Sequence, residues 1–247
     1  MFFVFPVLAF LPAAVYLAAA LLPALLLLRW IYRSVTVEPE PPGLLVKLFF
    51  LGCLSALCAG LLEGIGEFVL ELFIDPGSPA YVVLLAFLVV AAAEEGAKLF
   101  FLRRGSWEHP AFNYRFDGVV YAVFVSLGFA ALENVQYVVN YGLSVALPRA
   151  LLAIPGHMSF AVFMGVYYGR ARLLANLNRP REAEKAMRIG YFIAVFLHGF
   201  YDSCAMLNTN WSMCVFLLFV LLMFSRCYRT LKRESATDAP ITPWGGM

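Results

Sequence analysis

Seven long apolar runs separated by short polar segments constrain the fold of this chain more than any other feature. A helix needs roughly 20 apolar residues to cross the hydrocarbon layer of a bilayer, where only helices and closed barrels satisfy their own backbone groups. The runs cover residues 3–28, 44–73, 80–102, 116–140, 147–170, 189–208 and 211–228. We therefore predict an all-α, polytopic bundle of about seven transmembrane helices.

The overall composition agrees with a chain embedded in lipid. Hydrophobic residues make up 62% of the 247 residues and charged residues only 14%, against about a quarter charged in ordinary globular proteins. The formal net charge of +2 is too small to indicate a nucleic-acid partner. The five cysteines show no CxxC spacing and lie mostly inside apolar runs, so we expect neither disulfides nor a cysteine metal site.

The basic residues predict how the chain is oriented in the membrane. Sixteen of the 18 Lys and Arg residues fall on one side of the predicted bundle, the exceptions being Lys98 and Arg149. The positive-inside rule then places the N-terminus outside and the C-terminus in the cytoplasm. The first run is followed by Arg29 and Arg33 and has no basic leader, so we interpret it as a spanning helix rather than a signal peptide.

Two polar segments of the predicted cytoplasmic side are expected to be loops. The segment 171–188 is interpreted as a short charged loop, and residues 234–247, which contain Pro and Gly, as a disordered tail. Residues 1–233 are then expected to form a single transmembrane domain.

Ionisable residues occur inside the predicted spans, where they are costly and usually mark function. Glu94 and Lys98 are four residues apart, as are His198 and Asp202, so each pair shares a helix face. Two adjacent carboxylates in a medium of low dielectric repel each other, a setting that suits general acid or base chemistry. The full set is Glu63, Glu67, Glu71, Glu94, Glu95, Lys98, Glu133 with Asn134, His157, His198 and Asp202.

The two histidines in the spans suggest a polar cavity. His157 follows Pro155 and Gly156, a pair that can begin or break a helix and free backbone groups. His198 and Asp202 can bind a metal, or they can act as a proton-transfer or oxyanion-stabilising pair. The spacing alone leaves these alternatives open.

Other functions are compatible with the same residues. A relay of intramembrane Glu and His is equally expected in a proton- or cation-coupled transporter, although the sequence shows no paired inverted repeats. Glu94 and Glu95 can also form a structural contact between helices, and Lys98 can extend its ammonium to the membrane surface. The residues by themselves therefore do not separate an enzyme from a transporter.

Four motifs together resemble the PrsW-type intramembrane proteases: EEGAK at 94–98, FAALEN at 129–134, the isolated His157, and HGFYD at 198–202. These proteases are similar to the wider family of CAAX-prenyl proteases and bacteriocin-processing enzymes, whose motifs are EExxxR, FxxxH and HxxxN. The resemblance covers about 90–205 and implies a catalytic core at about 80–208. It implies cleavage of a single-pass or membrane-anchored protein, such as an anti-sigma factor, in the bacterial cytoplasmic membrane.

The resemblance also suggests which residues carry the chemistry. Glu133 falls where the wider family has histidine, and Asp202 falls where it has asparagine. Those two carboxylates make a divalent metal, with Zn²⁺ as the candidate, a reasonable alternative to a mechanism that uses glutamate alone. The implied catalytic residues are Glu94, Glu95, Glu133, His157, His198 and Asp202, supported by Lys98 and Asn134, and the implied metal ligands are Glu133, His157, His198 and Asp202.

Overall fold

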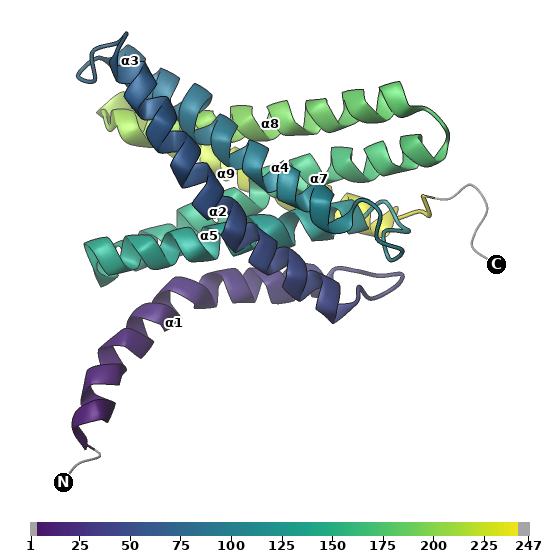
Figure 1. Ribbon diagram of the computed structural model, residues 1–247, viewed down its shortest axis with the longest axis horizontal. Coiled ribbons are helices and arrows are strands. Elements are labelled where there is room, and N and C mark those ends of the chain that lie inside the picture. Colours follow the sequence, from purple (N-terminus) through teal and green to yellow (C-terminus); the bar gives the residue numbers. More distant parts are fainter. Residues whose placement is uncertain (1–3, 242–247) are drawn as a thin grey trace.

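The computed structural model describes residues 4–241, and within them the chain forms seven helical segments long and apolar enough to cross a membrane (Figure 1). Five are α1 (Val4–Arg33), α2 (Pro42–Glu71), α5 (Asp117–Tyr141), α8 (Pro180–Leu207) and α9 (Asn210–Ala236). The third consists of α3 (Pro79–Leu84), a π-helical segment (Leu85–Ala91) and α4 (Ala92–Ser106). The remaining one consists of a 3₁₀ turn (Leu143–Val145), α6 (Ala146–Pro148), a π-helical segment (Arg149–Ala153) and α7 (Ile154–Asn176). The predicted all-α bundle is confirmed.

The polar segment between α7 and α8 is mostly helical, which corrects the prediction of a charged loop at 171–188. Helix α7 continues to Asn176, and α8 already begins at Pro180. Lys, Arg, Glu and Ala are good helix formers, so the helices extend beyond their apolar parts. Asn178 has a positive φ of 57°, which lets the chain turn in the remaining three residues, and Pro180 suits the first helical position.

The C-terminal segment up to Ile241 also differs from the expected disordered tail. Helix α9 continues to Ala236, and the residues after it pack beside the connection between α4 and α5. The backbone N–H of Arg115 donates to the Ala239 carbonyl at 3.0 Å, and that of Ile241 donates to the Asn113 carbonyl at 2.9 Å. Ile241 is buried. Residues 242–247 lie outside the described part of the chain.

Helix α5 lies at the centre of the bundle, and glycines let its neighbours approach it closely. Every residue from Asp117 to Ala131 is buried. A Cβ on Gly52 of α2 would lie 2.0 Å from the Val125 carbonyl oxygen, and one on Gly128 would lie 2.0 Å from the Phe49 carbonyl oxygen. Glycine is therefore required where α2 and α5 cross.

The chain direction alternates between successive spans, so the helix ends form two groups. One group, at the right of Figure 1, comprises the ends of α1, α4, α7 and α9 and the starts of α2, α5 and α8. Apart from Lys98 and Arg149, the Lys and Arg residues belong to this group, which we call the basic end. The positive-inside rule predicts that this end is cytoplasmic.

Candidate functional site

Two wide helical turns precede the helices that carry the site. The π-helical segment Leu85–Ala91 leads directly into α4, whose first two turns carry the EEGAK motif. A second such segment, Arg149–Ala153, leads into α7, which has His157 in its first turn after Pro155. Single π turns change the direction of the side chains that follow and are frequent at functional sites. The polar residues that follow the two segments, Glu94, Glu95 and Lys98 on α4 and His157 on α7, are buried.

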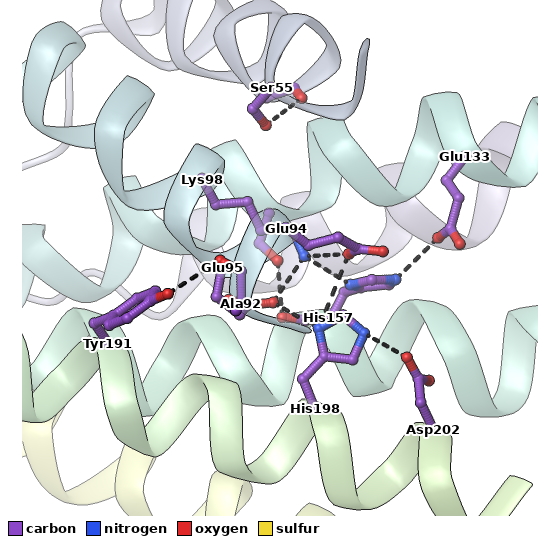
Figure 2. Close-up of polar contacts among 12 residues, drawn as sticks. Ser55, Ala92, Glu94, Glu95, Lys98, Glu133, His157, Tyr191, His198 and Asp202 are labelled. Carbon is purple, nitrogen blue, oxygen red and sulfur yellow. Dashed lines mark hydrogen bonds and ion pairs between the residues drawn. The ribbon is translucent and has the colours of Figure 1, made fainter. Parts of the chain in front are cut away.

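The centre of the site is a buried cluster around the ammonium group of Lys98 (Figure 2). Lys98 Nζ lies 2.9 Å from Glu94 Oε2, 2.8 Å from Glu95 Oε1 and 3.2 Å from His157 Nδ1. His198 Nδ1 lies 3.0 Å from Glu95 Oε1. Residues that α4, α7 and α8 contribute from distant parts of the sequence thus meet in one place.

A carboxylate outside the central cluster contacts Nε2 of each imidazole. Glu133 Oε2 lies 3.0 Å from His157 Nε2, and Asp202 Oδ2 lies 3.1 Å from His198 Nε2 (Figure 2). Both histidines consequently direct Nδ1 towards the central cluster and Nε2 towards an outer carboxylate. This contact fixes the orientation of each ring, as carboxylates do for metal-binding histidines.

Arg149 is a component of the site that the sequence interpretation missed. Arg149 Nη2 lies 2.8 Å from Glu133 Oε2, and Arg149 Nε donates to Asn134 Oδ1 at 2.8 Å. Its guanidinium also lies 3.7 Å from the ring centroid of Tyr137. Asn134 in turn donates to the carbonyl of Ala20 on α1 at 2.8 Å. The available signal was the position of Arg149 as an isolated cation away from the basic end.

A cavity of about 640 Å³ lies over this cluster, away from the basic end. Glu94 borders the cavity, whereas Glu95, whose side chain is fully buried, does not. Of the acidic residues on α2, Glu63 lines the cavity, while Glu71 accepts a hydrogen bond from Tyr81 at 3.4 Å. Other lining residues that carry charge or an imidazole are Glu133, Arg149, His157, His198 and Asp202.

The donor groups of the central cluster suit a divalent metal. Glu94, Glu95, His157 and His198 each offer one ligand atom, and these four atoms lie within 4.8 Å of one another. Imidazole nitrogen and carboxylate oxygen are zinc ligands, and Glu95 Oε2 is buried without a hydrogen-bond partner among the described residues. The ammonium of Lys98 now stands among these donors. A metal bound by all four would therefore have to displace it.

Charge balance points the same way. The four carboxylates at positions 94, 95, 133 and 202 are accompanied by two permanent cations, Lys98 and Arg149. With neutral imidazoles the group has a formal charge of −2, and buried charge requires compensation. A divalent cation would supply it, and so would protons on the imidazoles or on a carboxyl.

A buried carboxylate–imidazole centre lies beneath a cavity inside a bundle of helices long enough to span a membrane, which defines a polytopic membrane protein with a polar centre among its spans. The sequence pattern of the family described as PrsW family intramembrane metalloprotease matches residues 40–226. The chain belongs to this family.

Individual relatives agree with the family match. The chain is 31% identical to Protease PrsW of Halalkalibacterium halodurans over 222 residues, which cover 90% of this chain and 98% of that protein. It is 32% identical to Protease PrsW of Bacillus subtilis over 195 residues, which cover 79% and 84%. The corresponding protein of Clostridioides difficile is 29% identical over 209 residues, which cover 83% and 85%. No solved structure matches the chain.

These matches confirm the resemblance inferred from the four motifs. The protein is a multi-pass bacterial membrane protein and an intramembrane endopeptidase. The transporter interpretation, which the residues alone left open, is not the one that the family supports.

Proposed function

We propose that Glu94, Glu95, His157 and His198 form the catalytic centre that hydrolyses a peptide bond of a membrane-anchored protein. One observation carries this proposal: the four groups converge from three helices in one buried cluster at the base of the 640 Å³ cavity. The same convergence supports our proposal of a catalytic core at about 80–208 within a single transmembrane domain.

The two glutamates have different roles in this proposal. Glu94 borders the cavity, so its carboxylate is the one that can accept a proton from an attacking water and return it to the leaving amine. Glu95 is enclosed and contacts both Lys98 and His198. It therefore holds these two groups in position.

The metal ligands supported by the geometry differ from those inferred from the sequence. Glu95, His157 and His198 would hold the ion, with Zn²⁺ as the candidate, which leaves Glu94 as the base and one position open for water. Glu133 and Asp202 would orient the imidazoles from behind. A zinc ion bound there would polarise the scissile carbonyl and activate water. The family description, which names a metalloprotease, supports a metal but does not name zinc.

The substrate class follows from the position of the cavity. Its walls include apolar residues such as Phe129 and Leu152 beside the charged ones, and helices that form them belong to the spanning bundle. A substrate that reaches this centre must present its peptide bond within the membrane. We infer a single-pass or membrane-anchored protein, similar to an anti-sigma factor by family resemblance.

Cleavage of a single-pass substrate by the purified protein tests the catalytic assignment. Glu94→Gln and His198→Ala are each expected to lower the rate by about 10²–10⁴-fold, because each removes a group needed for proton transfer or for the centre itself. Glu71→Gln is the matched control, since Glu71 lies on α2 outside the cluster. Unchanged cleavage by Glu94→Gln would contradict its assignment.

Metal analysis, with activity measured before and after chelation, tests the ion. We expect about one metal per chain, loss of activity on chelation, and recovery with Zn²⁺. Lys98→Met sharpens the test, because it removes the ammonium that competes for the same donors. This variant should still bind the metal. Full activity in a metal-free preparation would reject the ion and leave a mechanism that uses the Glu and His residues alone.

A further inference from the structure

A second cavity lies at the basic end, on the other side of the bundle from the catalytic cluster. Its volume is about 500 Å³, and it is formed by α7, α8, α9 and Arg115, which lies two residues before the start of α5. Arg170 on its rim follows His157 by 13 residues of the same helix, which is about 20 Å along the axis. The charged lining residues are Arg115, Arg170, Arg233 and Glu234, and the apolar ones include Phe163, Val166, Leu173 and Ile193.

Close helix packing brings two of the arginines together. A Cβ on Gly169 would lie 2.1 Å from the carbonyl oxygen of Arg115, so only glycine allows α7 to approach the start of α5 at this point. Arg170 is the next residue of α7. The C-terminal segment holds Arg115 from the other side, because Arg115 Nη2 donates to the Thr237 carbonyl at 2.9 Å.

The residues that line the cavity carry a net positive charge. Three arginines and one glutamate give a formal charge of +2, and Glu234 is already paired with Arg233 at 2.7 Å. Within the described part of the chain, neither Arg115 nor Arg170 forms an ion pair, and Arg115 Nε is buried without a hydrogen-bond partner. Guanidinium groups in this state are suited to bind phosphate oxygens.

The apolar wall distinguishes a lipid from a free anion. Phe163 lies seven residues deeper along α7 than Arg170, about 10 Å towards the middle of the bundle. Val166 and Ile193 continue this wall between the helices. The site therefore has a basic mouth at the expected membrane surface and an apolar interior, which match the headgroup and the acyl chain of a phospholipid. Inorganic phosphate has no apolar part that could contact this wall.

We propose that this cavity binds an anionic phospholipid, with its phosphate against Arg115, Arg170 and Arg233 and an acyl chain along Phe163, Val166 and Ile193. Basic pockets between helices on the cytoplasmic side of membrane proteins bind anionic headgroups in this way. The proposal does not depend on which residues perform catalysis.

Lipid titrations of the purified full-length chain in neutral detergent, followed by native mass spectrometry, test the proposal. We expect phosphatidylglycerol to bind in preference to phosphatidylcholine. The double variant Arg170→Gln/Arg233→Gln is expected to weaken phosphatidylglycerol binding about tenfold or more, since each arginine near the surface contributes to attraction of an anionic lipid. Arg170→Lys/Arg233→Lys keeps the charge and should weaken it less.

The control variant is Arg181→Gln/Lys185→Gln, which removes the same charge from α8 at the same end but outside this cavity. It should bind phosphatidylglycerol as the wild type does. The proposal is overturned if the control loses binding equally, or if phosphatidylcholine binds as tightly. Displacement of the lipid by millimolar inorganic phosphate would overturn it too, since it would indicate a site for the free anion.

Discussion

The two halves of α5 have the same secondary structure but very different surroundings. From Asp117 to Ala131 every residue is buried, and α2 and α7 pack against the helix through glycines. Beyond Ala131 only Asn134 and Val138 are buried, and this half faces the catalytic cavity with Glu133. One helix thus joins a tightly packed part of the bundle to the wall of the cavity.

The difference between the two halves bears on how the residues beneath the cavity are positioned. A hydrogen bond links the packed half to the cluster beneath the cavity. Ser126, in that half, donates a hydrogen bond to the carbonyl of His157 at 2.9 Å. The dense packing of the first half therefore fixes the backbone of a residue in the catalytic cluster, while the second half leaves room for a substrate.

Substituting alanine for each of two glycines is expected to give the largest contrast, because the two changes should shift the free energy of unfolding in opposite directions. Gly128→Ala places a Cβ against the backbone of Phe49 and should lower the free energy of unfolding by about 3 kcal/mol or more, because backbone cannot yield as a side chain can. Gly60→Ala, on the cavity wall with nothing within 4 Å of its Cβ, should raise it by about 0.5–1 kcal/mol. Unfolding in detergent measures both. Equal effects would show that the crossing of α2 with the packed half of α5 and the α2 wall of the cavity do not differ in packing.

Glu133→Gln tests whether the open half orients the catalytic cluster. Its carboxylate holds His157 Nε2 at 3.0 Å, and loss of such an outer contact lowers activity or metal affinity by about 10–100-fold. Substrate cleavage and metal content of the variant are the measurements, with Gln136→Ala on the same cavity wall as the control. If Gln136→Ala loses as much activity, the effect belongs to the wall and not to the imidazole contact.

Arg149→Gln should lower activity less than Glu133→Gln does, because Glu133 keeps its contact with His157 when the arginine is removed. Residues in one network are not additive. In the Glu133→Gln background, Arg149→Gln is therefore expected to cause little further loss. A double-variant cycle on cleavage rates checks this, and fully additive losses would mean that Arg149 acts independently of Glu133.

Glu40→Gln tests a contact of the packed half of α5, and we expect it to change only the pH dependence of stability, the smallest of these effects. Tyr121 of α5 donates a hydrogen bond to Glu40, and burial raises the pKa of this carboxyl above its ordinary value of 4.5. The folded protein then retains a proton that the unfolded chain releases, so stability falls as pH rises from 4.5 towards the raised pKa.

Gln cannot release this proton, so the variant's melting temperature should change less between about pH 4 and pH 8 than that of the wild type. Glu38→Gln is the control, because Glu38 lies in the same connection and hydrogen-bonds Asn113 at 3.1 Å. The same pH profile in wild type and Glu40→Gln would contradict the assignment.

Much of the fold and of the site could be predicted from the sequence. The apolar runs at 44–73 and 116–140 required membrane helices. The costly charges within the spans marked a larger set of candidates, Glu94, Glu95, Glu133, His157, His198 and Asp202, without dividing it into inner and outer residues. Arg149 was not predicted, because its interaction with Glu133 joins two helices and leaves no periodic pattern in either. The helical ends of α7 and α8 within 171–188 were not predicted. The length of an apolar run indicates where a helix leaves the lipid, but the helix can continue into water beyond that point.

By itself, the sequence determined that the chain spans a membrane and which ionisable groups must be sheltered there, because lipid leaves few alternatives for either backbone or charge. Only the tertiary structure decided which carboxylates meet at Lys98 and which contact the imidazoles from the outer side. It also decided that α5 is the central helix and that a second cavity forms beside Arg170. These properties depend on how close the helices come at glycines such as Gly128 and Gly169, and that distance is set by contacts between residues far apart in the chain.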